Sequence, residues 1–133
     1  MIVGIADTHV VIWYLYDDER LSQTAGDFID QAAAQANHIG VSPITIVEMI
    51  YLIERGRIPA EALQIIVGVL KQPDAVFTHI PFDLGIAQAL QQIDRSNVPD
   101  MPDRIVAATA RHLGVPVISR DSRIRASSIR TIW

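Results

Sequence analysis

Acidic residues stand at the ends of apolar segments in this 133-residue sequence. Asp7 ends the first apolar run, and Asp121 comes two residues after the run at 115–119. Glu48 lies in the second turn of an expected helix, and Asp103 lies in the first turn of another. Four carboxylates held together would repel one another, and divalent cations are the economical way to offset that charge. An all-oxygen set selects hard ions such as Mg²⁺ or Mn²⁺, which activate water and stabilise a phosphoryl transition state.

Three of these acids, and a fifth at Asp100, also have ordinary structural explanations. Asp7 would cap the helix that follows it. Asp103 would offset the dipole of the helix that it begins, and Asp100 would do the same or lie in a loop. Asp121 would suit a turn. The choice between these roles and a shared site depends on whether the acids meet in the fold.

Glu48 discriminates best between the two explanations. The segment around it, Ile44–Ile53, is apolar nearly all round and therefore predicts a largely buried helix. A carboxylate in such a place is costly unless it is paired or bound to a metal. The competing explanation is an ion pair with Arg55 or Arg104.

Strand-like and helix-like segments alternate along the whole chain, which predicts a three-layer α/β/α domain around a mainly parallel sheet of four or five strands. Residues 1–133 are expected to form one domain. Strands are expected at 2–6, 38–42, 76–80, 115–119 and 129–133, and helices at 10–16, 23–36, 43–55, 59–71, 84–93, 102–113 and 121–126.

The topology of such a domain decides where the acids lie. A helix that returns between parallel strands runs antiparallel to them, so its N-terminus lies at the edge that carries the strands' carboxyl ends. Ligands of open α/β sheets bind at that edge. Asp7 and Asp121 follow strands, whereas Asp103 and Glu48 lie in the first and second turns of helices, so all four are expected on this one edge.

Composition excludes several classes of protein. The chain has no cysteine, which removes disulfides, thiolate catalysis and cysteine-based metal sites. No apolar stretch approaches the roughly 20 residues of a membrane span. The N-terminus lacks the pattern of a secretory signal, because Asp7 interrupts its apolar run and no basic segment precedes it. A cytoplasmic protein that does not enter a membrane is therefore expected.

The motifs around the four acids resemble a PIN domain, in an order and spacing that is most similar to the VapC-type toxins of toxin–antitoxin pairs. The resemblance spans essentially the whole chain. It rests on Asp7-Thr8-His9, Glu48 after Ser42-Pro43, Asp100-Met101-Pro102-Asp103-Arg104 with Ala107-Ala108-Thr109-Ala110, and Ser119-Arg120-Asp121. Trp13 and Glu54-Arg55-Gly56-Arg57 resemble one VapC-like subgroup.

The resemblance implies a metal-dependent endoribonuclease, using Mg²⁺ or Mn²⁺, that a cognate antitoxin holds inactive. By position, Asp7 and Asp103 match the family's principal metal ligands, and Glu48 and Asp121 match the acids that complete the site. Ser119 matches a small hydroxyl residue beside the fourth acid. Asp100 and Thr8 are accessory candidates, and the family does not fix a role for Asp100.

Two further expectations concern partners. Residues 1–103 contain 14 acidic and 5 basic residues, whereas residues 104–133 contain 1 acid and 6 arginines, which weakly indicates a polyanionic partner. The residues expected to contact RNA are Arg104, Arg120, Arg123 and Arg125. Apolar residues crowd the third and fourth expected helices, which predicts a homodimer or a larger assembly; they are Ile50, Ile53, Ile58, Ile65, Ile66 and Val69.

Rival α/β enzymes fit the chemistry less well. A receiver-type phosphoacceptor domain needs a pair of acids after the first strand and a late lysine, but the chain has one acid there and no lysine after Lys71. A phosphatase of the haloacid dehalogenase type needs Asp-x-Asp, and here the second position is His9. The alternative that stays open is a PIN-like module that binds RNA or protein without cutting.

Overall fold

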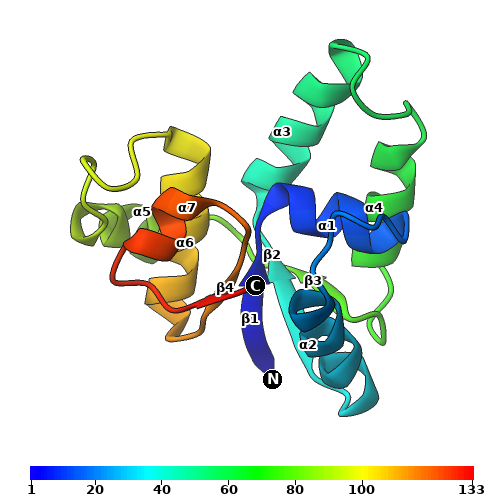
Figure 1. Cartoon of the computed structure of the whole chain (residues 1–133), viewed down its shortest axis with the longest axis horizontal. Helices are drawn as coiled ribbons and strands as arrows, with labels where there is room; N and C mark the ends of the chain where they lie inside the picture. Colours follow the sequence, from blue (N-terminus) through cyan, green and yellow to red (C-terminus); the bar gives the residue numbers. More distant parts are fainter.

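The computed structural model describes residues 1–133 and contains one five-stranded sheet in the order β3-β2-β1-β4-β5, with every pairing parallel. Figure 1 shows the arrangement of its elements. The strands are β1 (Ile2–Ala6), β2 (His38–Val41), β3 (Phe77–His79), β4 (Val117–Ile118) and β5 (Thr131–Ile132). The helices are α1 (Thr8–Leu15), α2 (Gln23–Ala34), α3 (Pro43–Glu54), α4 (Ala62–Leu70), α5 (Leu84–Ala89), the 3₁₀ turn η1 (Leu90–Gln92), α6 (Met101–Leu113) and α7 (Ser122–Ala126).

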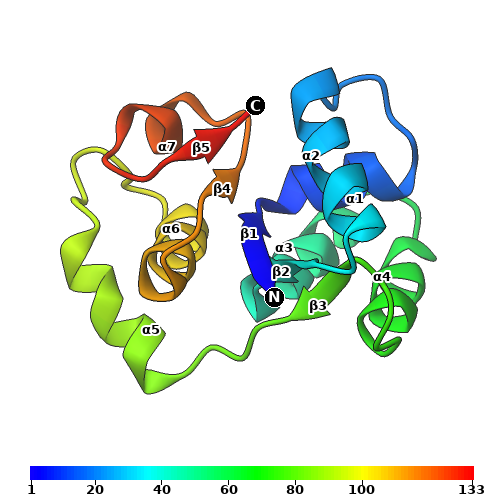
Figure 2. The same ribbon diagram turned by 90° about the horizontal axis from the view of Figure 1, so that it is seen from below.

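Helices cover both faces of the sheet, as the alternating pattern predicts, so the three-layer α/β/α expectation is confirmed (Figure 2). Helices α1 to α4 pack one core against the sheet around Ile39 and Phe77. Helices α5 to α7 pack the other around Val106 and Val117. The central strand β1 is fully buried at Ile5, which explains its unbroken apolar sequence.

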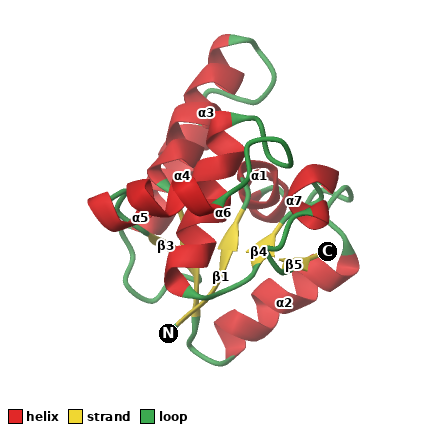
Figure 3. Ribbon diagram, turned by 90° about the vertical axis from the view of Figure 1, so that its left-hand side faces the viewer, coloured by secondary structure: helices red, strands yellow, loops and turns green.

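One expectation about α3 is wrong. Its apolar sequence predicts a largely buried helix, but only Thr45 and Met49 are buried, whereas Val47, Ile50 and Tyr51 are exposed. The helix rises past the carboxyl ends of the strands, so the sheet covers only part of its surface (Figures 1 and 3). The apolar sequence of α3 therefore belongs to a helix that the rest of the chain covers only in part.

Element ends differ from the sequence-based bounds where short turns intervene. Helix α4 begins at Ala62 rather than at Pro59, because the residues between them form turns. Strands β4 and β5 have two residues each, fewer than expected. Gly114 ends α6 with a positive φ of 68°, as a glycine after a helix predicts. No helix is both long and apolar enough to cross a membrane.

Candidate active site

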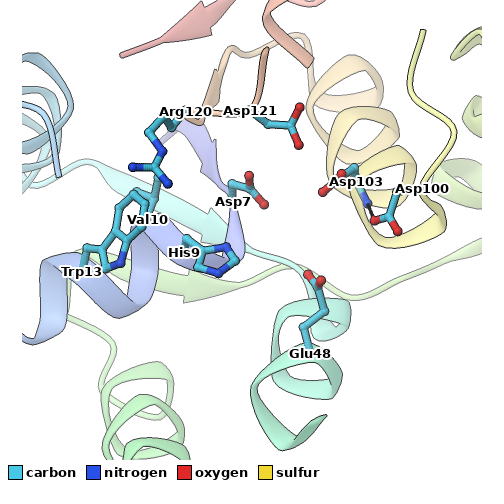
Figure 4. Close-up of a pocket in the computed structure, with 9 residues that line it drawn as sticks. All are labelled: Asp7, His9, Val10, Trp13, Glu48, Asp100, Asp103, Arg120 and Asp121. Atoms are coloured by element: carbon cyan, nitrogen blue, oxygen red, sulfur yellow. Dashed lines mark hydrogen bonds between the residues drawn. The ribbon is translucent and has the colours of Figure 1, made fainter. Parts of the chain in front are cut away.

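A pocket of about 270 Å³ lies at the carboxyl edge of the sheet (Figure 4). Its wall combines side chains from β1 and α1, from α3, from the start of α6 and from the segment after β4. Five acids line it, namely Asp7, Glu48, Asp100, Asp103 and Asp121. The structure therefore brings together the four acids singled out in the sequence, and Asp100 with them.

Asp7 is the most buried of these acids, with 8% of its surface exposed. It caps α1, and its Oδ1 accepts a hydrogen bond of 2.8 Å from the Thr8 backbone N–H. Its Oδ2 accepts a second bond of 2.8 Å from the Ser119 hydroxyl. Burial raises the pKa of Asp7, although the bonds from Ser119 and Thr8 act in the opposite direction. Asp7 is thus a helix cap and a pocket acid at once.

Ser119 connects two of the acids. Its hydroxyl donates to Asp7 and accepts a bond of 2.9 Å from the Asp121 backbone N–H. Asp121 in turn caps α7, and its Oδ1 accepts from the Arg123 N–H at 2.8 Å. No protein group donates to Asp121 Oδ2, so this oxygen is available to a ligand in the pocket.

Glu48 has no basic partner. The chain contains one salt bridge, Arg20 to Asp18, so the expected alternative of an ion pair with Arg55 or Arg104 is wrong. The Thr8 hydroxyl donates to Glu48 Oε1 at 2.5 Å and lies 3.1 Å from the hydroxyl of Thr45, a fully buried residue.

The electrostatics of Glu48 reflect this environment. Burial raises its pKa, and the nearby charges of Asp7 and Asp100 add to that effect. The carboxylate points into the pocket (Figure 4), and the neutral Thr8 hydroxyl rather than a cation binds it. Its charge is therefore left for a ligand.

Asp100 and Asp103 come from the start of α6. Asp100 caps this helix by accepting a bond of 3.3 Å from the Asp103 backbone N–H. The pKa of Asp103 is raised to about 8, first by burial and then by the charges of Asp7, Asp100, Asp121 and Glu48. A carboxyl that holds its proton near neutral pH in the metal-free protein lies in a strongly negative pocket.

A hard divalent cation suits this set of donors, which are all oxygens. The acids point into one space from different elements, yet no three Asp, Glu or His side chains lie close enough to form a ready ligand cluster. Mg²⁺ usually keeps several waters and binds through one or two carboxylates, so a hydrated ion fits the open arrangement. Asp7 and Asp103 face each other across the pocket and could share such an ion.

The predicted RNA-contacting arginines lie in different places. Arg120 lines the pocket, and its guanidinium carbon lies 4.7 Å from the centre of the Trp13 ring. Arg123 and Arg125 are exposed on α7, beside but outside the pocket wall. Arg104 turns away from the acids, because its guanidinium donates to the backbone oxygens of Leu90 and Ile93. Nη2 of Arg104 is thus engaged by the segment at and just after η1, and a contact between Arg104 and RNA stays a prediction.

An aromatic wall of the pocket was not foreseen from the sequence. His9 is exposed, lines the pocket, and lies 5.5 Å from the Trp13 ring centre. Arg20 and Arg120 both lie over Trp13, at 5.2 and 4.7 Å from its centre. The spacing of His9 and Trp13, four residues apart on a helix, could have indicated this pairing. The two arginines come from loops, and no sequence pattern joins them to Trp13.

Comparison with known proteins identifies the family. The family model of the PIN domain matches residues 5–128 of this sequence. The chain belongs to the PIN domain family. It is 27% identical over 129 residues to "Ribonuclease VapC22" of Mycobacterium tuberculosis, an alignment that covers 95% of this chain and 92% of that protein. The family resemblance seen in the motif residues is therefore confirmed.

Solved structures share the fold. A chain of VapBC2 from Rickettsia felis, crystallised with a DNA fragment from its promoter, superposes with a TM-score of 0.70 at 12% identity, covering 98% of this chain and 97% of that one. A toxin–antitoxin complex from Klebsiella pneumoniae gives a TM-score of 0.64 at 19% identity, covering 98% and 96%. At these identities the likeness concerns the PIN architecture alone.

Proposed function

We propose that the protein is a metal-dependent endoribonuclease, the toxin of a toxin–antitoxin pair, that hydrolyses cytoplasmic RNA within one nuclease unit spanning residues 1–133. The observation that carries the proposal is the meeting of Asp7, Glu48, Asp103 and Asp121 in one pocket at the carboxyl edge of the sheet. Similarity to a protein named a ribonuclease supports the choice of RNA as substrate. Mg²⁺ or Mn²⁺ bound there would activate the attacking water and offset charge on the phosphate.

The chain's own residues divide the work by their position. Asp7 and Asp103, which face each other across the pocket, would hold a divalent cation, and the carboxyl of Asp103, whose pKa is raised to about 8, would bind it as the carboxylate. Glu48, aimed by Thr8, orients the water for in-line attack. Asp121, fixed by Ser119, completes the site with its unbonded oxygen. Arg120 holds a phosphate at the rim.

A nuclease assay with controlled metal content tests this function. Purified protein is expected to cleave single-stranded RNA with Mg²⁺ or Mn²⁺ and to stop when the metal is chelated. Asp103→Asn and Asp7→Asn should each lower the rate by orders of magnitude, because in-line attack needs metal, water and phosphate aligned. Circular dichroism shows whether each variant keeps the fold. Cleavage that survives chelation or Asp103→Asn would contradict the proposal, and a folded protein that binds RNA without cutting it would favour the non-catalytic alternative.

Two protein partners belong to this proposal. A cognate antitoxin is supported by the toxin–antitoxin complexes that share the fold. Self-association is supported by exposed apolar residues on α3 and α4, namely Val47, Ile50 and Ile65. Of the residues expected to drive it, Ile66 is fully buried in the core and cannot take part. A light-scattering mass of one subunit at micromolar concentration would contradict self-association.

A further inference from the structure

A second pocket, also of about 270 Å³, opens beside the acid pocket. Both have His9 of α1 and Glu48 of α3 among their lining residues, so the two pockets adjoin at these side chains. Its other lining residues are Tyr51, Leu52, Arg55 and Pro102. Glu48, Tyr51 or Leu52, and Arg55 recur at helical spacing on α3, so they form one stripe that leads outward from the acids.

Two side chains of this stripe have no partner within the protein. Tyr51 is 57% exposed, its hydroxyl makes no hydrogen bond, and no other ring stacks on it. Arg55 is exposed at the C-cap of α3 and makes no salt bridge, although the body of the protein is acidic. An exposed aromatic ring next to an unpaired arginine is the combination with which proteins hold single-stranded nucleic acid, by stacking on bases and binding phosphates.

We propose that this second pocket binds the nucleobase next to the scissile phosphate, with Tyr51 stacked on the base and Arg55 on the following phosphate. The inference rests on the proposed function and adds a substrate subsite to it. It also suggests a path for the RNA, because Arg120 lines only the acid pocket and Arg55 lines only the second. The guanidinium groups of Arg120 and Arg55 would thus contact the RNA on two sides of the acids.

A nucleotide suits the second pocket because this pocket adjoins the acids. A strand whose phosphate lies among the acids must place its neighbouring nucleotide against an adjoining wall, and the second pocket lies on the other side of His9 and Glu48. Ile50 lies on a different side of α3 from Glu48 and Arg55, whereas Val47 precedes Tyr51 by one helical turn, so the apolar patch borders the second pocket at Tyr51. The mass measurement below therefore distinguishes a nucleotide from a second copy of the chain at this residue.

A double-mutant cycle between protein and RNA tests the inference. The probe is a short single-stranded RNA that the wild-type protein cleaves at one mapped position, made intact and with single abasic nucleotides on either side of the cut. Tyr51→Ala should raise KM about tenfold with kcat nearly unchanged, since stacking on one base contributes roughly 1–3 kcal/mol. One abasic position should cost the wild type the same factor and cost Tyr51→Ala nothing more. Tyr51→Phe should behave as wild type.

Arg55 is tested separately by the salt dependence of binding. Arg55→Ala should flatten the log–log slope of affinity against salt by about one unit, as expected for one lost phosphate contact. Tyr16→Ala is the matched control, because Tyr16 is also an exposed tyrosine but lines neither pocket, and it should change none of these values.

The outcomes separate this inference from the proposed function. If the wild type cleaves no RNA, the proposed function fails and the subsite with it. If the wild type cleaves RNA but Tyr51→Ala and the abasic RNAs have additive effects, or none, only the subsite is overturned. A Tyr51→Ala variant that cleaves normally but changes its light-scattering mass would assign the surface to an interface between copies.

Discussion

Thr8 joins two of the pocket acids through one residue. Its backbone N–H donates to Asp7, while its hydroxyl donates to Glu48 and meets Thr45. Thr8→Val keeps the shape but removes the hydroxyl, so Glu48 loses its orientation. We expect kcat to fall roughly tenfold to a hundredfold, which is the scale of a misplaced catalytic group. Single-turnover cleavage with saturating Mn²⁺ measures this loss.

Variants of Thr8 and Thr45 should affect stability and activity differently. Thr8→Val leaves the buried Thr45 hydroxyl without its partner, which costs about 1–3 kcal/mol of unfolding free energy. Replacing both threonines with valine should recover much of that stability, because no unpaired group is left between them. The double variant should cleave as slowly as Thr8→Val. Thr8→Ser keeps the hydroxyl and should cleave at nearly the wild-type rate. Equal recovery of both properties in the double variant would show that Thr8 has only a packing role.

Asp103 makes the stability of the metal-free protein depend on pH. Its pKa is about 8 in the folded state, against an ordinary value of 3.8. Between these values the unfolded chain binds fewer protons than the native protein, so the free energy of unfolding falls as pH rises. The raised pKa values of Asp7 and Glu48 act in the same direction.

Urea unfolding in chelator from pH 4 to pH 8 should therefore show stability declining with pH, and Asp103→Asn should make the decline shallower. Added Mg²⁺ should reverse the trend by replacing the proton. The salt-bridged Asp18 cannot mimic this, because its pKa is lowered to about 2 and its contribution disappears only in stronger acid. A flat profile in chelator would mean that neither burial nor mutual repulsion raises the pKa values of the pocket acids in the folded protein.

At the scale of elements, residues at helix N-termini form much of the site, and α6 shows how one acid can serve both the helix and the pocket. Asp100 is the N-cap of α6 and also lines the pocket. Asp100→Asn should leave stability unchanged, because asparagine caps as well as aspartate, whereas Asp100→Ala should cost about 1 kcal/mol. Denaturant titration of both variants measures this.

The variants Asp100→Asn and Asp100→Ala also test whether Asp100 takes part in cleavage. If it is only a cap, Asp100→Asn should retain cleavage, and it should lower the pKa of Asp103 by removing one of the charges that raise it. A large loss of cleavage in Asp100→Asn with unchanged stability would instead make Asp100 a fifth functional acid.

Much of the fold and the meeting of the acids could be predicted, because both follow from local pattern and parallel topology. The apolar run before Asp7 and the proline after Ser42 mark a strand end and a helix start that the structure reproduces. The environment of Glu48 could not be predicted, because the hydroxyl that donates to it belongs to Thr8, 40 residues earlier, and no local pattern links the two. The inward turn of Arg104 onto η1 depends likewise on tertiary packing.

At the scale of the whole molecule, charge is distributed unevenly around the site. The acids gather in the pocket, and all but one of the acids of the chain lie before Arg104, whereas six arginines lie from Arg104 onward. An acidic body repels RNA, so the substrate needs cationic contacts that are not already engaged. Helix α7 begins at the pocket acid Asp121 and exposes Arg123 and Arg125 next to it.

Replacing Arg123 and Arg125 together with alanine should therefore weaken RNA binding and flatten its salt dependence by roughly one unit of log–log slope per lost contact. Mn²⁺ affinity should stay unchanged, because neither side chain lines the pocket. The matched control is Lys71→Ala with Arg95→Ala, which changes the net charge equally through exposed residues of other segments. If both double variants shifted the slope alike, RNA would respond to net charge alone. If neither did, the path of the substrate would lie on the α3 side of the acids, away from α7.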